Sequence, residues 1–281
     1  MSEVELQELL DFSVSIAREA GEITLGYFRK KFETRLKGKD NFVTQADVEA
    51  ENFLRSRIAG RFPADSIIGE EGGASVGASS RRWIIDPIDG TYSFVHGVPF
   101  YGVLLGVEEE GEPVVGVINI AALGEMVYAA RGLGCFWNGE RARVSKTRAL
   151  EDALLLSTDF GSCARHGHGA AAEELQRRAS MRRTWGDCYG YVLVATGRAD
   201  VMLDPAMNVW DCAALLPVIE EAGGTFTDWK GRRTIHSGDA VATNGFLFDE
   251  VMRIVTANEP VSRANETNVS ADEPNADEKR K

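Results

Sequence analysis

Residues 83–91 read W-I-I-D-P-I-D-G-T. An apolar run ends on Asp86, a second carboxylate follows at Asp89, and Gly90 and Thr91 come next. Proline restricts the backbone between the two acids, and both Asp and Pro favour turns. Taken alone, this D-P-x-D stretch is explained by an ordinary turn at the end of a strand.

Three other stretches also have carboxylates where an apolar element starts or stops. S-I-I-G-E-E-G-G at 66–73 ends an apolar run with two glutamates, and V-W-D-C-A-A-L-L at 209–216 opens an apolar helix with Asp211. N-F-V-T-Q-A-D at 41–47 begins an amphipathic helix with Asp47. Each acid alone is explained as a helix cap or a solvated end. Four such places in one chain predict that carboxylates gather at one rim of the core.

Gathered carboxylates repel one another and are costly to desolvate. Such a cluster takes up protons or binds a cation, and hard divalent cations such as Mg²⁺ prefer oxygen ligands. The Gly90–Thr91 step adds backbone N–H groups, which suit a phosphate. We therefore expect Asp86 and Asp89 to bind metal, and the turn after them to bind the anion that the metal activates.

The composition excludes several classes of partner. The 281 residues are 44% hydrophobic and 26% charged, which is ordinary for a soluble globular protein, and the formal net charge is −12. An acidic chain repels nucleic acids and anionic membranes, so neither is an expected partner. The N-terminus carries acids where a signal peptide needs bases, and no apolar stretch reaches about 18 residues. We expect a cytoplasmic protein.

The cysteines form no C-x-x-C pair and are irregularly spaced, so neither zinc nor a disulfide framework is expected from Cys135, Cys163, Cys188 and Cys212.

Periodicity divides the chain into two parts. Helical spacing predicts helices over 4–32 and 45–59. Short, closely spaced runs then favour antiparallel strands at 66–70, 83–86, 101–108, 113–120 and 125–130, with a hairpin turn at 111–113. After about residue 150, strands alternate with helices and suggest an α/β unit. The strands are expected at 154–159 and 199–204, and the helices at 169–179, 189–197 and 210–222. We predict a catalytic domain over 1–257 and a disordered acidic tail over 258–281, which has almost no apolar residues.

The chain resembles the magnesium-dependent, lithium-sensitive phosphatases of the inositol monophosphatase superfamily. Three motifs carry this resemblance in the order found in that family: G-E-E, W-I-I-D-P-I-D-G-T and W-D-C-A-A. V-T-Q-A-D resembles the region before that family's second helix, and the likeness runs from about residue 10 to about residue 255. The resemblance implies a layered αβαβα sandwich, like that of fructose-1,6-bisphosphatase, and a homodimer.

The resemblance also implies a set of metal ligands. Glu70, Asp86 and the carbonyl of Ile88 would bind one Mg²⁺, while Asp86, Asp89 and Asp211 would bind a second. It implies two or three ions in each active site and inhibition by lithium.

The catalytic residues implied by the resemblance are Glu70, Asp47 and Thr91. A water activated by the metal attacks phosphorus in line, and the Thr91 hydroxyl, hydrogen-bonded to Asp47, helps to orient or deprotonate it. The second metal stabilises the leaving oxygen. Glu71 lies with Asp47 in the surrounding shell, and backbone N–H groups near Gly90 bind the phosphate.

Two further stretches, R-R-T-W-G-D-C-Y-G-Y at 182–191 and M-N-V-W-D at 207–211, resemble the histidinol-phosphate phosphatase branch. Inositol is a neutral polyol, whereas histidinol carries an ammonium and an imidazole, so its site should present carboxylates away from the phosphate. Asp187 stands where inositol enzymes usually have a small hydroxyl residue, and Asp204 where they have a glutamate. An ammonium–Asp187 bond would contribute roughly 1.5–3 kcal/mol. From the residues alone, Asp187 is equally well explained as a turn residue.

The remaining candidates are weaker. Arg183 would contact the phosphate or brace its loop, and a salt bridge within the fold explains it equally well. H-G-H at 166–168 suggests either a metal site or a surface loop. The predicted substrate-binding set is Ile88, Asp89, Gly90, Thr91, Arg183, Gly186, Asp187, Cys188, Asp204 and Asp211.

We predict a Mg²⁺-dependent phosphomonoesterase that hydrolyses L-histidinol phosphate to L-histidinol and phosphate in histidine biosynthesis. The alternative enzyme is an inositol-1-phosphate or broad sugar-phosphate phosphatase. An alternative of another class is a non-catalytic regulator that binds metal or phosphate. The presence of every predicted metal ligand and of Thr91 argues against the regulator.

Overall fold

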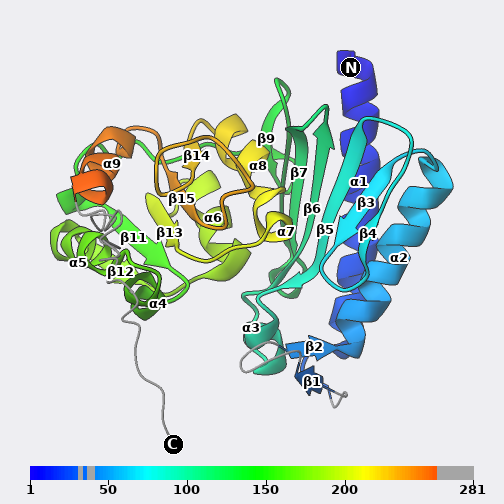
Figure 1. The fold of residues 1–281 in the computed structure, drawn as a ribbon, viewed down its shortest axis with the longest axis horizontal. Coiled ribbons are helices and arrows are strands. Elements are labelled where there is room, and N and C mark those ends of the chain that lie inside the picture. The colour runs from blue at the N-terminus through cyan, green and yellow to red at the C-terminus, as the bar shows by residue number, and fades with distance from the viewer. Residues whose placement is uncertain (31–33, 37–41, 258–281) are drawn as a thin grey trace, which may run out of the picture.

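The computed structural model describes residues 1–30, 34–36 and 42–257. This part of the chain is arranged in five layers (Figure 1). An outer helix layer packs on an eight-stranded sheet, a middle helix layer lies between this sheet and a five-stranded one, and a third helix layer covers the far face. The αβαβα sandwich is therefore confirmed. The predicted tail at 258–281 lies outside the described residues.

The helices on the outer face of the eight-stranded sheet are α1 (Glu3–Tyr27) and α2 (Gln45–Arg61). Helix α2 lies close to its predicted range, whereas α1 ends at Tyr27, before the predicted end at residue 32. Both begin with a capping box. The side chain of Ser2 or Thr44 caps the helix, and the carboxylate three residues later accepts the backbone N–H of that capping residue. Their apolar faces bury Leu10, Ile16 and Leu54 against the eight-stranded sheet. In the described part of the chain, no helix combines the length and the apolar character needed to span a membrane.

The eight-stranded sheet has the order β10-β9-β8-β7-β6-β5-β3-β4, and all its pairs are antiparallel except β3 with β5. Its hairpin between β6 and β7 turns at Glu110 and Gly111, which both have positive φ, as a two-residue turn with the favoured twist requires. The strands are β3 (Ser66–Gly69), β4 (Gly73–Ser75), β5 (Arg81–Asp89), β6 (Gly102–Glu109), β7 (Glu112–Ile120), β8 (Glu125–Ala130), β9 (Gly134–Trp137) and β10 (Glu140–Arg141). A separate pair, β1 (Thr34–Leu36) and β2 (Phe42–Thr44), precedes α2, and α3 (Thr91–Val95) follows β5.

The five-stranded sheet has the order β12-β11-β13-β15-β14. Strand β11 is parallel to both neighbours, and β15 is antiparallel to both of its own. The strands are β11 (Leu154–Ser157), β12 (Met181–Arg183), β13 (Val201–Asp204), β14 (Thr225–Thr227) and β15 (Ala240–Thr243). Helix α6 (Asp187–Ala195) lies between the two sheets. The third helix layer, on the far face of the five-stranded sheet, contains α4 (Phe160–Arg165), α5 (Gly169–Arg178) and α9 (Phe248–Ala257). Short 3-10 turns are η1 (Ala121–Leu123) and η2 (Leu150–Asp152).

The single helix predicted over 210–222 is wrong. The structure has two short helices, α7 (Val209–Cys212) and α8 (Leu215–Glu221). Pro217 has no N–H to donate to the carbonyl of Ala213 four residues earlier, and its ring crowds that carbonyl, so the hydrogen-bonded ladder breaks there. The break leaves Asp211 in a single helical turn of its own.

Two glycines on the eight-stranded sheet allow this broken helix to pack closely. A Cβ on Gly116 would lie 2.1 Å from the carbonyl oxygen of Ala214, and one on Gly106 would lie 2.6 Å from the carbonyl carbon of Ala213. Both distances are shorter than the non-bonded contacts that a Cβ makes in proteins. The junction of α7 and α8 therefore rests directly on the backbone of β6 and β7, which fixes the height of Asp211 above the sheet.

We expect Gly116→Ala to lower the free energy of unfolding by about 1–3 kcal/mol, because the added methyl group overpacks this contact. Gly26→Ala is the matched control, because Gly26 lies in α1 with no neighbouring atom within 4 Å of its Cβ position. It should be neutral or stabilise the protein by up to about 1 kcal/mol. Urea unfolding of both variants checks the pair; equal effects would mean that the close contact does not matter.

Candidate active site

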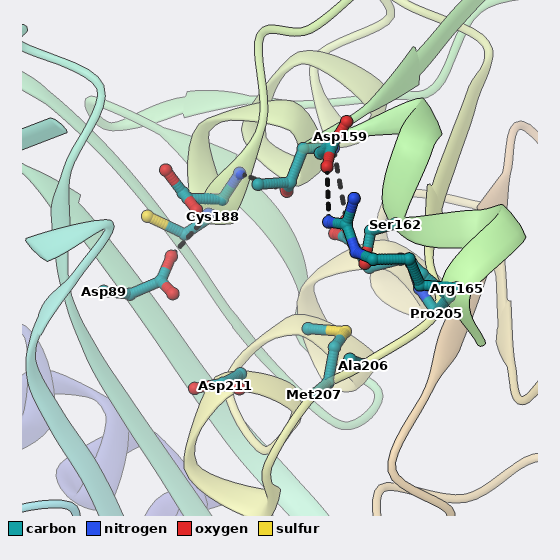
Figure 2. Close-up of a pocket in the computed structure, with 12 residues that line it drawn as sticks. Asp89, Asp159, Ser162, Arg165, Cys188, Pro205, Ala206, Met207 and Asp211 are labelled. Atoms are coloured by element: carbon teal, nitrogen blue, oxygen red, sulfur yellow. Dashed lines mark hydrogen bonds and ion pairs between the residues drawn. The ribbon is translucent and has the colours of Figure 1, made fainter. Parts of the chain in front are cut away.

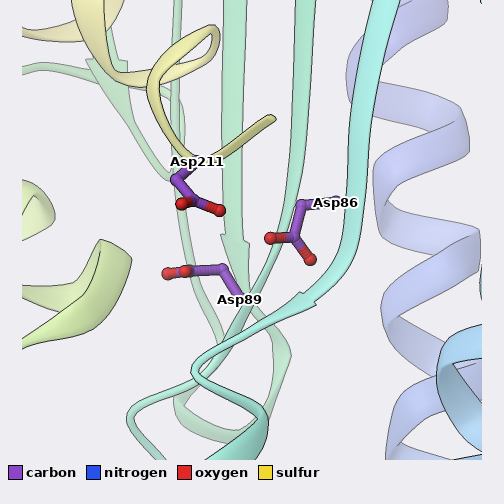
Figure 3. A group of neighbouring side chains, drawn as sticks. All are labelled: Asp86, Asp89 and Asp211. Carbon is purple, nitrogen blue, oxygen red and sulfur yellow. The ribbon is translucent and has the colours of Figure 1, made fainter. Parts of the chain in front are cut away.

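Three carboxylates from two distant segments converge beside the end of β5. Asp86 and Asp89 come from β5 and Asp211 from α7, and one oxygen of each lies within 4.8 Å of the others. Figure 3 shows the three side chains pointing into one shared space. Such a spacing allows one cation to contact all three, as predicted from the sequence.

Local turn chemistry puts these acids in place. Strand β5 pairs regularly with β6 as far as Asp86, and the register is irregular between Asp86 and Asp89. The carboxylate of Asp86 accepts the N–H of Ile88 (3.0 Å) across Pro87, so the D-P-x-D stretch is also a side-chain-stabilised turn. Asp211 accepts the N–H of Asn208 (2.6 Å), which caps α7. The acids therefore stabilise a turn and a helix cap and also form the site. The turn and the cap fix the direction in which the carboxylates point.

The cluster is electrostatically unfavourable as a bare set of charges. Asp86 is buried, and desolvation raises its pKa well above the usual aspartate value, with repulsion from Glu70 as the next cause. Desolvation and repulsion from Asp187 raise the pKa of Asp89 in the same way, and desolvation raises that of Asp211 to about 6. Among the ion pairs formed within the described residues, none involves the three clustered acids.

The residues present fit a hard divalent cation. Three oxygen ligands stand close together in a partly dry site, and their mutual repulsion is what a bound dication would offset. The carbonyl of Ile88 is next to Asp89 in the chain and accepts the Thr91 hydroxyl (2.9 Å). A carbonyl oxygen has two lone pairs and is a suitable ligand for a hard cation. Glu70 is not in the group of three, but its charge acts on Asp86 from the end of the neighbouring strand β3.

The expected hydrogen bond between Thr91 and Asp47 is not formed. Thr91 follows the N-cap Gly90 of α3, where its hydroxyl reaches back to the carbonyl of Ile88 three residues earlier. Asp47 is fully buried, and its Oδ2 accepts both the N–H (2.8 Å) and the hydroxyl of Thr44. Its Oδ1 is buried without a hydrogen-bond partner in the described part of the chain, and desolvation raises its pKa to about 6. A buried oxygen of this kind is a candidate for bonding a water or a substrate group.

A cavity of about 190 Å³ extends from the cluster to the end of the five-stranded sheet (Figure 2). It brings together five predicted site residues: Asp89, Asp187, Cys188, Asp204 and Asp211. Its other lining residues were not predicted from the sequence; they are Thr158, Asp159, Ser162, Arg165, Pro205, Ala206 and Met207. A signal was present for two of them. Thr158 and Asp159 end a buried strand on polar groups, as Asp86 does.

Asp187 is held in an uncommon backbone conformation. It opens α6 with φ +51°, in the left-handed region where a residue with a side chain is strained. Its N–H donates to Thr158 (2.9 Å), its carboxylate accepts the Ser93 hydroxyl (3.3 Å), and desolvation raises its pKa to about 6. A Cβ on Gly90 would lie 2.9 Å from this carboxylate. The carboxylate of Asp187 therefore lies against the predicted phosphate turn at Gly90.

Asp204 lies at the carboxyl end of β13 and lines the cavity. Its two oxygens accept the N–H of Thr158 (3.2 Å) and the hydroxyl of Tyr191 (3.1 Å). The indole N–H of Trp229 donates to its carbonyl (3.0 Å). Asp204 is buried, and desolvation raises its pKa to about 7. Two acids, Asp187 and Asp204, thus share one cavity beyond the cluster.

Other predicted substrate residues act through the backbone or lie elsewhere. The N–H of Cys188 donates to Asp89, and Gly186 lets α6 approach β11, because a Cβ there would lie 2.3 Å from the Cα of Thr158. Arg183 is exposed on the edge strand β12, where it donates to the carbonyl of Arg182 (2.8 Å) and does not line the cavity.

The H-G-H stretch supplies no metal site within the described residues. The ring of His168 stacks on Trp229 with 4.1 Å between centroids, and His166 bonds the carbonyl of Ser162 (3.0 Å).

The raised pKa values predict how stability depends on pH. Asp47, Asp187 and Asp211 titrate near 6 and Asp204 near 7 in the folded state, above the unfolded aspartate value. These four groups add to the free energy of unfolding, and their contribution is fully present below the pKa of an unfolded aspartate. It is lost as pH rises through the pKa of the folded state. We expect metal-free protein to have a higher Tm at pH 5.5 than at pH 7.5, and Mg²⁺ to reduce the difference. Scanning calorimetry with EDTA or Mg²⁺ checks this; a metal-free Tm that rises over this window would contradict it.

Known proteins similar to this chain are phosphatases, which agrees with a site that suits a metal and a phosphate. The model of the inositol monophosphatase family matches residues 5–259. The histidinol-phosphatases of Chlorobaculum parvum and Mycobacterium tuberculosis are 43% and 38% identical, over 83% and 88% of this chain and 91% and 98% of their own lengths. The solved structure of an IMPase from Thermotoga maritima superposes with a TM-score of 0.81 at 34% identity, over 89% of this chain and 97% of that one. The chain therefore belongs to the inositol monophosphatase family and is a phosphoric monoester hydrolase.

Proposed function

We propose that this protein is a Mg²⁺-dependent phosphatase that hydrolyses L-histidinol phosphate to L-histidinol and phosphate. The observation that carries the proposal is the pair Asp187 and Asp204 in the same cavity as Asp89 and Asp211. One pair of acids suits a metal, and the other suits a cationic leaving group. The names of the two histidinol-phosphatases that are 43% and 38% identical to this chain support the same substrate.

Each part of the site has a task in this reaction. Asp86, Asp89 and Asp211 would hold the metal, with Glu70 and the carbonyl of Ile88 as further ligands. When bound, the metal supplies a water of lowered pKa and offsets the negative charge of the phosphate. The N–H groups that follow Gly90 would bind the phosphate oxygens at the start of α3.

Asp47 and Thr91 would orient the attacking water in this scheme. The Oδ1 of Asp47 has no hydrogen-bond partner among the described residues and is available to accept a proton or a hydrogen bond. The Asp47 pKa of about 6 suits a group that exchanges protons near neutral pH. The Thr91 hydroxyl can rotate from the Ile88 carbonyl to the water, because a hydroxyl both donates and accepts.

The substrate's chemistry matches the groups that line the cavity. In histidinol phosphate the ammonium is on the carbon next to the ester carbon, so it would lie just past the metal cluster, near Asp187 and Asp204. The imidazole would occupy the part of the cavity lined by Ser162 and Met207. A neutral polyol would leave two desolvated carboxylates without a cationic partner, which is costly.

The test is a comparison of kcat/KM for L-histidinol phosphate and inositol 1-phosphate, with Mg²⁺, on one preparation. We expect the first to be higher. A higher value for inositol 1-phosphate would support the sugar-phosphate alternative. Metal binding without phosphate release from any of a panel of monoesters would support the non-catalytic regulator.

Four finer points remain part of the proposal. We propose that two or three Mg²⁺ ions bind in each site, that lithium inhibits, that two chains form a homodimer, and that the protein works in the cytoplasm. Metal stoichiometry by calorimetry, inhibition curves with LiCl, and sedimentation equilibrium test the first three.

A further inference from the structure

A buried carboxylate outside the metal cluster is bonded to the turn that carries Glu70. Glu51 lies on α2 with 2% of its surface exposed. We infer that Glu51, together with Arg55, positions the 69–72 turn and thereby sets the affinity of the site for its divalent metal. Glu51 would be a positioning residue, because it acts through the turn. The inference rests on the metal site of the proposed function.

The contacts of Glu51 account for both of its oxygens. Oε2 accepts the N–H of Glu71 (2.8 Å), and Oε1 accepts the N–H of Gly72 (2.7 Å). Arg55, one helical turn further along α2, donates from Nε to the same Oε1 (2.7 Å) and from its guanidinium to the carbonyl of Gly73. The Glu51–Arg55 pair therefore bonds three consecutive residues, Glu71 and Gly72 of the turn and Gly73 at the start of β4.

The two glycines that flank the glutamates are explained by this pair. A Cβ on Gly69 would lie 2.5 Å from Oε1 of Glu51, and one on Gly72 would lie 2.8 Å from the same atom and 2.9 Å from Nε of Arg55. Neither glycine has a positive φ, so space and not backbone conformation requires them. The sequence G-E-E-G at 69–72 thus lets the side chains of α2 approach the backbone of the turn directly.

The 69–72 turn is close to the metal site, so a small shift of its backbone would move a metal ligand. Gly69 is paired with Ile85 in the parallel β3–β5 ladder, one residue before Asp86. Glu70 acts electrostatically on Asp86, and Glu71 acts on Asp47. Loosening the turn would therefore move Glu70 relative to Asp86. Groups that orient a metal ligand in this way typically change metal affinity by about 10- to 100-fold when they are removed.

The decisive variant is Glu51→Gln, which keeps the shape of the side chain. Its amide has one acceptor oxygen, so one of the two turn N–H groups would face an NH₂ group instead. We expect calorimetry with Mg²⁺ alone to give a Kd raised about 10- to 100-fold. In turnover assays, the Mg²⁺ concentration for half-maximal rate should rise equally, while kcat at saturating Mg²⁺ stays near the wild-type value.

The matched control is Glu19→Gln. Glu19 lies on α1 and pairs with Arg57 of α2. The two side chains are 44% and 40% exposed and, within the described part of the chain, bond no residue of the 69–72 turn, so the loss of Glu19 should leave the Mg²⁺ Kd unchanged. If Glu51→Gln does not fold, Arg55→Gln is used in its place. In that variant Glu51 still accepts hydrogen bonds from both N–H groups of the turn. A smaller rise in Kd is expected there.

Several results would overturn the inference. An unchanged Mg²⁺ Kd in folded Glu51→Gln, or in Arg55→Gln if the first variant is unfolded, would do so. A lower Tm in EDTA with an unchanged Kd would also do so, because Glu51 would then support the fold alone. Failure of the wild-type protein to bind Mg²⁺ would instead overturn the proposed function, and the inference with it.

Discussion

Asp89→Asn is expected to lower kcat by about 10³-fold while the protein stays folded. The neutral amide removes one of the charges that would hold a dication between β5 and α7. A metal that stabilises transition-state charge is worth several kcal/mol, and a loss of about 4 kcal/mol corresponds to about 10³-fold. The asparagine oxygen can still accept the N–H of Cys188, so the surrounding backbone keeps its bond.

The same substitution should have the opposite effect on stability. Without metal, Asp89 is a partly desolvated charge beside Asp211 and Asp187, and its removal relieves repulsion. We therefore expect Asp89→Asn in EDTA to unfold at the same temperature as the wild type or a higher one, and to gain less from added Mg²⁺. Phosphate-release assays and thermal scans on the same samples measure both effects. Wild-type turnover in this variant is incompatible with a metal held by the three acids.

Asp187→Asn should impair the hydrolysis of L-histidinol phosphate much more than that of a neutral phosphate ester. A charge-assisted bond to the substrate ammonium contributes roughly 1.5–3 kcal/mol, which is about tenfold to over a hundredfold in kcat/KM. Asparagine is the right replacement, because it tolerates the left-handed backbone at this position and can still accept the Ser93 hydroxyl. The measurement is the ratio of kcat/KM for the two esters.

Asp159→Asn provides the matched control for Asp187. Asp159 lines the same cavity, but its carboxylate already bonds Arg165 (2.7 Å) and the N–H of Gly161 (2.8 Å). With its charge offset by Arg165, its loss should change the ratio between the two esters little. Equal losses for both esters in Asp187→Asn would remove Asp187 from recognition of the ammonium.

The sequence located elements that carry their own periodic pattern. Helix α2 and strand β7 were predicted close to their observed limits, because an apolar stripe or a buried run identifies them without their neighbours. The missed elements depend on contacts. Strands β12 and β14 have three residues each and exist as strands because longer neighbours pair with them. The break between α7 and α8 has a signal in the sequence, because Pro217 cannot donate to the carbonyl of Ala213.

The metal cluster was predictable because each acid ends or starts an apolar element. Asp86, Asp89 and Asp211 could be recognised one at a time and were then brought together by the fold. The cavity wall was less predictable, because Ser162 and Met207 carry no pattern that distinguishes them from loop residues. Arg183 was an attractive candidate by its charge, and only the fold places it on an outer edge strand.

The central claim is that Asp86, Asp89 and Asp211 together bind a divalent cation. Crystals grown with Mn²⁺ in place of Mg²⁺ test it most directly, because Mn²⁺ accepts similar oxygen ligands and scatters X-rays anomalously. We expect an anomalous peak within coordination distance of all three carboxylates, and its loss in Asp89→Asn. No peak among these acids at saturating Mn²⁺, or a peak only elsewhere on the protein, would contradict the account.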